Sequence, residues 1–412
     1  MTAPGRRVFL LGSTGSIGTS ALDVVRDFTR ARAAHGTVGP RPPRFDVVGL
    51  AAARNGASLA AQAREFGAQA VAVVDGDAAL DLPSGVRVFR GEEAACAMLD
   101  ACARRGDLVV AAMVGAAGIR PVLTAIAIGC DVALANKEAL VAAGAVVMPA
   151  AAAAGVRIIP VDSEHNALFQ CLKASTSMDE VRKVVLTASG GPFRTRTRDE
   201  MARATVDDAL AHPTWRMGAK VTIDSASLMN KALELIEAHW LFGLGADRID
   251  AIIHPQSVVH GFVEYLDGSV LAQLSPPDMR TPIQQAMCDP MRCDGPSRKL
   301  DFASLRSLDF EPVDQGRFPA IALAHRVIAT GGTAGSVFNA ANEVAVRAFL
   351  DGRIGFLDIA EVVRATLDAV PATPIPADAR GLDTVFAADH AARIRAQSLV
   401  DDGARLDLTA RI

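Results

Sequence analysis

The apolar run Val8 to Leu11 leads directly into Gly12-Ser13-Thr14-Gly15-Ser16-Ile17-Gly18, and sequence compatible with a helix follows. A strand, a glycine-rich turn and a helix in this order can hold a dinucleotide, because its pyrophosphate binds at the helix N-terminus. The spacing is GxxGxxG rather than GxGxxG, so a glycine-rich turn without a ligand is the alternative. Both interpretations place a strand and a helix at the start of an α/β fold.

Apolar runs and helical stretches alternate through the first third of the chain, which predicts a Rossmann-like, doubly wound parallel sheet with helices on both faces. The expected strands cover residues 8–11, 47–52, 70–74, 108–113 and 132–134. The segment from Arg30 to Arg44 is rich in Gly, Pro and Arg and is expected to be a surface insertion.

A second α/β unit is expected from Val156 as the central, catalytic domain of the chain. It is expected to contain a separate small sheet. Its predicted strands cover residues 156–161, 183–187, 249–253, 258–265 and 270–274. From Phe318 the pattern is helical and predicts a C-terminal helical bundle, with helices over residues 318–329, 336–350, 356–370 and 382–399. The predicted domains are therefore 1–155, 156–300 and 318–412, with a connector over 301–317.

Charge and cysteine usage narrow the class of protein. The formal net charge is −4 and no run of five like charges occurs, which favours a small-molecule ligand over nucleic acid or a membrane surface. Six cysteines without a CxxC pair argue against structural zinc and a disulfide framework, so a reducing, cytoplasmic location is expected. Residues 139–156 carry no charge, but Ala dominates there and Gly144 and Pro149 interrupt the stretch. A buried helix is expected there rather than a membrane span.

The residues after the second expected strand bear on the choice of cofactor. An NAD-binding protein usually places Asp or Glu at this point to bind the ribose hydroxyls, whereas this chain has Ala53-Arg54-Asn55. An arginine there suits a 2′-phosphate and favours NADP. An ordinary solvated arginine is the alternative.

Two carboxylates follow the expected strand 156–161. If the chain stays extended, Asp162 and Glu164 share a face and can converge on one cation. Oxygen ligands of this kind favour Mg²⁺ or Mn²⁺ over zinc. Solvated loop residues or a helix N-cap are the alternatives.

A second polar cluster lies on the helix expected after Asp224-Ser225. Asn230, Lys231 and Glu234 are spaced three and four apart, so they can line one side of that helix. Ser225, Asn230 and Lys231 can donate to a phosphate, and Glu234 can supply a third carboxylate to the metal. A solvent-facing Lys-Glu pair is the competing explanation.

Loops at residues 187–193 and 211–220 mix Gly or Pro with hydrogen-bond donors, as a phosphate pocket and a covering lid would. Trp215 lies in the second loop, either as part of a lid or as an anchor of the loop on the sheet. Lys137 follows the expected strand 132–134 and should lie near the nicotinamide end of the sheet, unless it forms a simple Lys-Glu pair at a helix start.

Taken in order, these segments resemble the motifs of the 1-deoxy-D-xylulose 5-phosphate reductoisomerase family. The matching blocks are Gly12 to Gly18, Asn136-Lys137-Glu138, Val161-Asp162-Ser163-Glu164, Ser189-Gly190-Gly191-Pro192-Phe193, His212-Pro213 through Met217-Gly218, Asp224 to Glu234, His254-Pro255-Gln256-Ser257 and Asn339-Ala340-Ala341-Asn342-Glu343. The resemblance implies an NADPH- and Mg²⁺- or Mn²⁺-dependent homodimer. Such an enzyme rearranges and reduces its sugar phosphate substrate to 2-C-methyl-D-erythritol 4-phosphate, a precursor for isoprenoids.

The resemblance also implies roles for individual residues. Metal binding falls to Asp162, Glu164 and Glu234, and catalytic roles to Lys137, Glu164 and His212. Substrate binding is implied for Lys137, Ser163, Glu164, Ser189, His212, Trp215, Ser225, Asn230, Lys231 and Glu234. NADPH binding is implied for Thr14, Gly15, Ser16, Ile17, Ala53, Arg54, Asn55, Asn136, Glu138 and Gly218.

Arg216 departs from the family pattern, in which a small polar residue is expected, and the insertion at 30–44 is long. Two alternatives to this family remain from the residues alone. One is another two-domain NADP-dependent reductase, which needs no trio of metal carboxylates. The other is a non-catalytic scaffold that senses NADPH.

Overall fold

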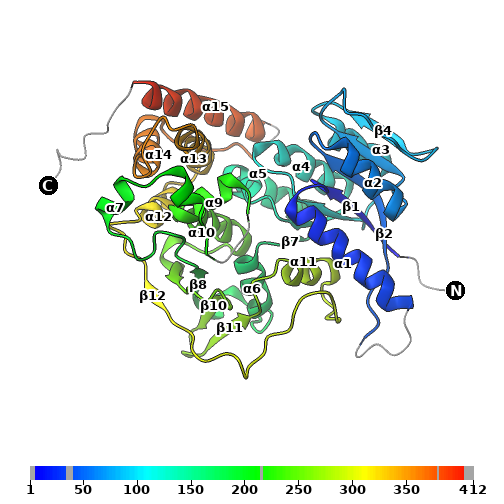
Figure 1. Ribbon diagram of the computed structural model, residues 1–412, viewed down its shortest axis with the longest axis horizontal. Helices are drawn as coiled ribbons and strands as arrows, with labels where there is room; N and C mark the ends of the chain where they lie inside the picture. The colour runs from blue at the N-terminus through cyan, green and yellow to red at the C-terminus, as the bar shows by residue number, and fades with distance from the viewer. Residues whose placement is uncertain (1–4, 34–39, 214–216, 378–379, 403–412) are drawn as a thin grey trace. The chain divides into compact units, whose positions relative to one another are not determined.

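The computed structural model describes residues 5–33, 40–213, 217–377 and 380–402 (Figure 1). The chain forms two compact units, and each takes in segments that are distant in sequence. The first unit comprises Met1–Ala139, Val147–Phe169 and Asp278–Lys299, and the second comprises Leu140–Val146, Gln170–Pro277 and Leu300–Ile412.

A parallel sheet of seven strands forms the first unit, in the order β4-β3-β2-β1-β5-β6-β7. Its strands are β1 (Arg6–Leu11), β2 (Phe45–Ala52), β3 (Ala70–Val73), β4 (Arg87–Arg90), β5 (Leu108–Ala111), β6 (Asp131–Leu134) and β7 (Ile158–Pro160). The strand order reverses between β1 and β5, which is where doubly wound sheets bind their ligands. The Rossmann-like sheet predicted from the sequence is confirmed.

Helices accompany this sheet. They are α1 (Ser16–Ala33), α2 (Gly56–Phe66), α3 (Ala94–Cys102), α4 (Ile119–Ile128), α5 (Glu138–Ala154), α6 (Ser163–Leu172) and α11 (Arg280–Cys288), with a short 3₁₀ helix η1 (Ala116–Gly118). α1 packs against α11, and α3 packs against α4 (Figure 1). Apolar residues of α11, among them Ile283 and Met287, belong to the same buried core as Val8 and Leu10 of β1.

The sequence placed residues 156–161 at the start of the second α/β unit, and this placement is wrong. Strand β7 pairs in parallel with β6 through Val132 and Ile158, so it is the edge strand of the first sheet. The pattern of apolar residues identified the strand but contained no information about its neighbour.

The second unit is built on a mixed sheet of five strands in the order β11-β10-β8-β9-β12. The strands are β8 (Val181–Ala188), β9 (Ile249–Ile253), β10 (Val259–Tyr265), β11 (Val270–Leu274) and β12 (Glu311–Pro312). β8 and β9 are parallel, and the remaining pairs are antiparallel. The separate small sheet expected from the sequence is therefore present.

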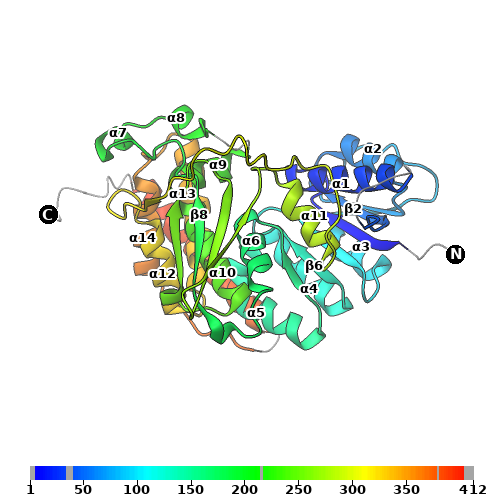
Figure 2. The same ribbon diagram turned by 90° about the horizontal axis from the view of Figure 1, so that it is seen from below.

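Helices make up the rest of the second unit. They are α7 (Arg198–Ala202), α8 (Val206–Leu210), α9 (Ala219–Ala226), α10 (Met229–Phe242), α12 (Ala320–Thr330), α13 (Ala334–Leu350), α14 (Asp358–Ala369) and α15 (Arg380–Asp401), with 3₁₀ helices η2 (Met178–Glu180) and η3 (Ala246–Arg248). α10 packs against β8 and β9, and α13, α14 and α15 pack together as the expected C-terminal bundle (Figures 1 and 2). None of the helices in the described residues combines the length and apolar character that a membrane crossing requires.

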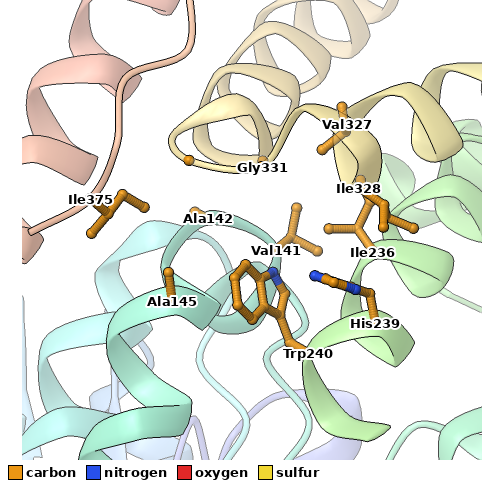
Figure 3. Close-up of a pocket in the computed structure, with 12 residues that line it drawn as sticks. Val141, Ala142, Ala145, Ile236, His239, Trp240, Val327, Ile328, Gly331 and Ile375 are labelled. Carbon is orange, nitrogen blue, oxygen red and sulfur yellow. The ribbon is translucent and has the colours of Figure 1, made fainter. Parts of the chain in front are cut away.

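The uncharged stretch at 139–156 forms most of α5, which is kinked at Ala143. Residues 140–146 of α5, next to the kink, belong to the second unit. There His239 and Trp240 of α10 face Val141 and Ala145 of α5 around a small cavity (Figure 3). This cavity leaves about 10 Å³ for the centre of a water molecule, so it has room for about one water and no larger ligand.

Gly144 lets Trp240 lie directly against α5. A Cβ atom added at Gly144 would lie 2.3 Å from Cγ of the Trp240 indole. We expect Gly144→Ala to lower the free energy of unfolding by about 1–3 kcal/mol, because the large, half-buried Trp240 ring must move. Urea denaturation would measure this change, with Gly76→Ala as the control because no heavy atom lies within 4 Å of its added Cβ. Equal stabilities for the two variants would contradict the prediction.

Candidate functional site

The glycine-rich turn after β1 is tightly packed at its first and last glycines. Gly12 has φ +88°, and a Cβ there would lie 2.4 Å from the carbonyl oxygen of Ala112, just after β5. A Cβ at Gly18 would lie 2.3 Å from the carbonyl oxygen of Gly12, so this glycine allows α1 to approach the turn. Gly15 is exposed at the start of α1, where backbone N–H groups can receive a pyrophosphate.

Other predicted cofactor residues lie within this turn and directly after the end of β2. Ser16 is exposed, whereas Thr14 and Ile17 are half-buried. Ala53, Arg54 and Asn55 are all exposed. Asn55 accepts a hydrogen bond from the backbone N–H of Ser58 at 3.1 Å and thereby caps α2. The Arg54 side chain is thus accessible to a 2′-phosphate, and no acidic residue takes its place.

Asn136, after β6, is buried and connects two loops of the first unit. Its side-chain amide donates to the carbonyl oxygens of Met113 at 2.5 Å and Gly115 at 2.9 Å. Its Oδ1 accepts from the backbone N–H of Ala139 at 2.8 Å. These bonds fix the loop after β5 against the start of α5, a structural role that the sequence did not reveal. Glu138, also expected at the cofactor site, is buried in the first turn of α5.

Asp162 and Glu164 lie at the start of a helix, so the expectation of extended geometry is wrong. α6 begins at Ser163, directly after Asp162, and the Asp162 carbonyl oxygen accepts from the backbone N–H of Asn166 at 2.8 Å. One carboxylate oxygen of Asp162 nevertheless lies within 4.8 Å of one from Glu164. The turn into the helix brings the two groups together, as the helix N-cap alternative allowed.

Cationic and hydroxyl groups surround these two carboxylates. The Lys137 ammonium lies 2.7 Å from Asp162 Oδ2. The Ser163 hydroxyl donates to Glu164 Oε2 at 2.5 Å. Lys137 therefore lies beside a proposed metal ligand, so the segment after β6 contacts the segment after β7.

In the second unit, α10 places three predicted residues on one side. Lys231 and Glu234 form an ion pair whose side chains are only 3% and 1% exposed, and Asn230 donates to the other oxygen of Glu234. The solvent-facing Lys-Glu pair considered from the sequence is excluded by this burial. A buried carboxylate of this kind requires a partner charge, and Lys231 supplies it.

Asp224, two residues from the end of α9, is also buried and doubly bound. Lys220 lies 3.1 Å from its Oδ2, and the Asn342 side chain of α13 donates to its Oδ1 at 2.8 Å. Asn342 belongs to one of the blocks that resemble the family, but the sequence assigned it no role. The structure shows that it anchors α9 to the helical bundle.

The loop at 189–193 brings further predicted residues together within the second unit. Ser189 Oγ lies 3.1 Å from His212 Nε2. Gly191 has φ +65°, and a Cβ there would lie 2.9 Å from the Ser225 carbonyl oxygen, so the loop packs directly on the end of α9. Burial lowers the pKa of the His212 imidazole below its ordinary value of 6.5, which favours the neutral ring at pH 7.

The remaining expected lid residues are only partly described. Gly218 is exposed and precedes the first residue of α9. Trp215 and Arg216 lie outside the described residues. The predicted metal ligands divide between the units, with Asp162 and Glu164 in the first and Glu234 in the second.

A doubly wound sheet with a glycine-rich turn and Arg54 after β2 forms the first unit, and the second unit carries buried carboxylates, lysines and the loop of Ser189. Together these features define a class of protein. This class is the two-domain NADP-dependent oxidoreductases that act on phosphorylated small molecules.

Comparisons with known proteins give the family. A model described as 1-deoxy-D-xylulose 5-phosphate reductoisomerase matches residues 8–144, its C-terminal domain matches 158–242, and a DXP reductoisomerase C-terminal domain matches 274–395. A reductoisomerase of Sinorhizobium medicae is 49% identical over 96% of this chain and 98% of its own length. The corresponding protein of Paraburkholderia phymatum is 48% identical over 97% and 98% of the two chains.

Solved structures agree. The reductoisomerase of Zymomonas mobilis in complex with NADPH is 44% identical, with a TM-score of 0.84 over 97% of this chain and 100% of its own. A DOX-P reductoisomerase in complex with NADPH, fosmidomycin and magnesium is 36% identical, with a TM-score of 0.84 over 96% and 98%. The chain belongs to the 1-deoxy-D-xylulose 5-phosphate reductoisomerase family.

Proposed function

We propose that this chain converts 1-deoxy-D-xylulose 5-phosphate to 2-C-methyl-D-erythritol 4-phosphate, with NADPH and a divalent metal, in isoprenoid precursor biosynthesis. The observation that carries this proposal is family membership over 96% of the chain together with the presence of every expected metal and phosphate residue. NADPH supplies the hydride that reduces the aldehyde formed by the rearrangement.

For the cofactor, the support comes from the first unit. The turn Gly12 to Gly18 presents exposed backbone at the start of α1, and Arg54 is exposed after β2. We infer that Thr14, Gly15, Ser16 and Ile17 bind the pyrophosphate and that Ala53, Arg54 and Asn55 bind the 2′-phosphate end. Asn136, Glu138 and Gly218 complete the proposed NADPH site.

For the metal, the support is the chemistry of the donor set. Asp162, Glu164 and Glu234 supply carboxylate oxygens, which suit Mg²⁺ or Mn²⁺. Two of these carboxylates are paired with a lysine, Asp162 with Lys137 and Glu234 with Lys231. The negative charge of each carboxylate is thus balanced by a positive charge, as a bound metal cation would also balance it. When bound, the metal acts as a Lewis acid on the hydroxyl and ketone oxygens of the substrate.

The remaining proposed residues bind the substrate. Ser189 and Ser225 lie on two segments that pack against each other, and Asn230 and Lys231 begin the next helix, so these four residues are proposed to hold the phosphate. His212, neutral beside Ser189, and Lys137, beside Asp162, are suited to orient the substrate and to accept or donate a proton. Ser163 contacts Glu164, and Trp215 is proposed to cover the site.

We further infer a homodimer, as the family resemblance implies, and a cytoplasmic location, as the cysteine usage suggests. As a division by function and not by packing, we propose 1–155 for NADPH, 156–300 for metal and substrate, a connector at 301–317 and the helical bundle at 318–412. By packing, residues 156–169 and 278–299 belong to the first unit. Sedimentation analysis would report the oligomeric state directly.

The proposed activity is tested by NADPH oxidation with 1-deoxy-D-xylulose 5-phosphate, before and after removal of metal with a chelator. We expect oxidation that stops on chelation and returns with Mg²⁺ or Mn²⁺. Oxidation that persists without metal would favour another NADP-dependent reductase. Normal NADPH binding without turnover under any metal would indicate a non-catalytic scaffold.

A further inference from the structure

The carboxylates of Asp162 and Glu164 depend on the position of α6, and one buried side chain fixes the first turn of that helix. The Asn166 amide donates to the carbonyl oxygen of Pro160, at the end of β7, at 2.9 Å. The same amide nitrogen donates to Gln285 Oε1 of α11 at 2.8 Å. Asn166 therefore ties α6 to the preceding strand and to a helix more than one hundred residues away in sequence.

Gln285 uses both ends of its side-chain amide. Its oxygen accepts from Asn166, and its nitrogen donates to Asp289 Oδ1 at 3.0 Å. Asp289 is held in turn by Arg157, whose Nη1 lies 3.0 Å from Asp289 Oδ2. Arg157 directly precedes β7, so the chain of bonds leads from α6 through α11 back to the strand that leads into α6.

The helix that carries Gln285 is a rigid support. Ile283, Ala286 and Met287 of α11 are buried in the core of the first unit together with residues of β1 and α1. Gln285 and Asp289 are each only 8% exposed, and Asn166 is 1% exposed. Inside such a core, a hydrogen bond with both partners buried restricts motion strongly, because an unpaired group costs about 1–3 kcal/mol.

We propose that Gln285 is a positioning residue for the metal site and that it acts through Asn166 on the turn bearing Asp162 and Glu164. This inference rests on the proposed function. Residues that orient metal ligands through hydrogen bonds, without binding the metal themselves, typically change metal affinity by about 10–100-fold when they are replaced. No residue of this chain of bonds is a metal ligand itself.

The test is to measure Mn²⁺ binding to the full chain, using the electron paramagnetic resonance signal of the Mn²⁺ that remains free. We expect Gln285→Leu to raise the Mn²⁺ dissociation constant by about 10–100-fold, because Asn166 loses its side-chain partner on α11 and keeps there only a long hydrogen bond, 3.4 Å, to the Pro282 carbonyl oxygen. Gln285→Glu should also weaken binding, since its carboxylate would face Asp289. Adding Asp289→Asn to the Gln285→Glu variant restores the original net charge and supplies a side-chain amide that can donate to the new carboxylate. The Mn²⁺ affinity should therefore return to near the wild-type value.

The chain supplies a matched control on the same helix. Gln284 donates to the carbonyl oxygen of Cys293 at 2.6 Å and belongs to a different set of hydrogen bonds. Gln284→Leu should therefore leave Mn²⁺ affinity unchanged. NADPH affinity and the thermal midpoint, measured in parallel, report whether a variant has lost its fold.

The possible outcomes separate the two proposals. If the wild type binds Mn²⁺ and both Gln285→Leu and Gln285→Glu bind it with the same affinity, the positioning role alone is overturned. The positioning role would also be overturned if Asp289→Asn, added to Gln285→Glu, restored the thermal midpoint but not the Mn²⁺ affinity. The network of hydrogen bonds would then be purely structural. Wild type that binds no Mn²⁺ would overturn the proposed function and this inference together.

Discussion

Glu234→Gln is expected to lower kcat/KM for 1-deoxy-D-xylulose 5-phosphate on the order of 10³-fold, because Lewis-acid stabilisation of several kcal/mol depends on a correctly held metal. The substitution keeps the size of the side chain and removes its charge. Steady-state kinetics across a range of Mg²⁺ or Mn²⁺ concentrations would measure the effect. The loss should persist at high metal concentration, since the neutral amide is a poor ligand for a hard cation.

The same substitution also affects the fold, because Lys231 is buried against Glu234. Removing one partner of a buried ion pair costs about 3–5 kcal/mol, so the thermal midpoint should fall. Glu234→Asp separates the two effects, since it keeps the charge beside Lys231 but shortens the reach toward the metal. We expect Glu234→Asp to be more stable than Glu234→Gln and still strongly impaired in turnover.

Glu264→Gln is the matched control for this experiment. Glu264 lies in the same unit and pairs with Arg182 at 3.2 Å in a partly exposed position. The change should alter kcat/KM and stability little, because exposed ion pairs contribute about 0–1 kcal/mol. Turnover in Glu234→Gln within a few-fold of this control would refute the proposed third ligand.

Gly12→Ala should give the second large effect, a joint loss of stability and NADPH affinity. The left-handed φ of +88° is unfavourable for alanine, and its Cβ would lie 2.4 Å from the Ala112 carbonyl oxygen. Backbone strain of this kind costs about 1–3 kcal/mol, and the clash must push apart the ends of β1 and β5. Because the clash also shifts the backbone N–H groups that are proposed to bind the pyrophosphate, we expect NADPH binding to weaken about tenfold, which corresponds to about 1.4 kcal/mol.

Gly15→Ala provides a contrasting control at the same turn. A Cβ at Gly15 would have its nearest neighbour at 3.4 Å, the carbonyl oxygen of Gly12, so the fold can accept it. The thermal midpoint should stay near the wild-type value, while NADPH affinity falls because the new methyl group lies where the pyrophosphate approaches. NADPH fluorescence titrations and thermal unfolding of both variants would show the difference. Equal loss of stability in both would contradict this account.

Local sequence patterns predicted most of the secondary structure. Apolar runs located β9 and β11 with their observed bounds, and turn residues separated the C-terminal helices correctly. Such patterns are local, because a strand or helix must present an apolar face wherever it lies in the fold. β4 was missed because its residues are largely exposed, and β12 because two residues leave no periodic pattern.

The identity of the candidate site residues was also accessible from the sequence, because ordered blocks of Gly, Asp, Ser, Lys and Glu are specific to the family. Their local geometry was less accessible. Asp162 and Glu164 were expected to continue the extended geometry of the preceding strand, yet α6 starts between them. A strand end and a helix start share the same few residues, and only packing determines where one changes into the other.

The sequence by itself determined the class of fold, the glycine turn and the set of carboxylates and lysines. Tertiary structure alone decided that β7 joins the first sheet, that residues 278–299 return to the first unit, and that Asn166 meets Gln285. The physical reason is distance along the chain. Hydrogen bonds between residues 119 positions apart leave no periodic signal in either segment, because only the folded core selects the partners.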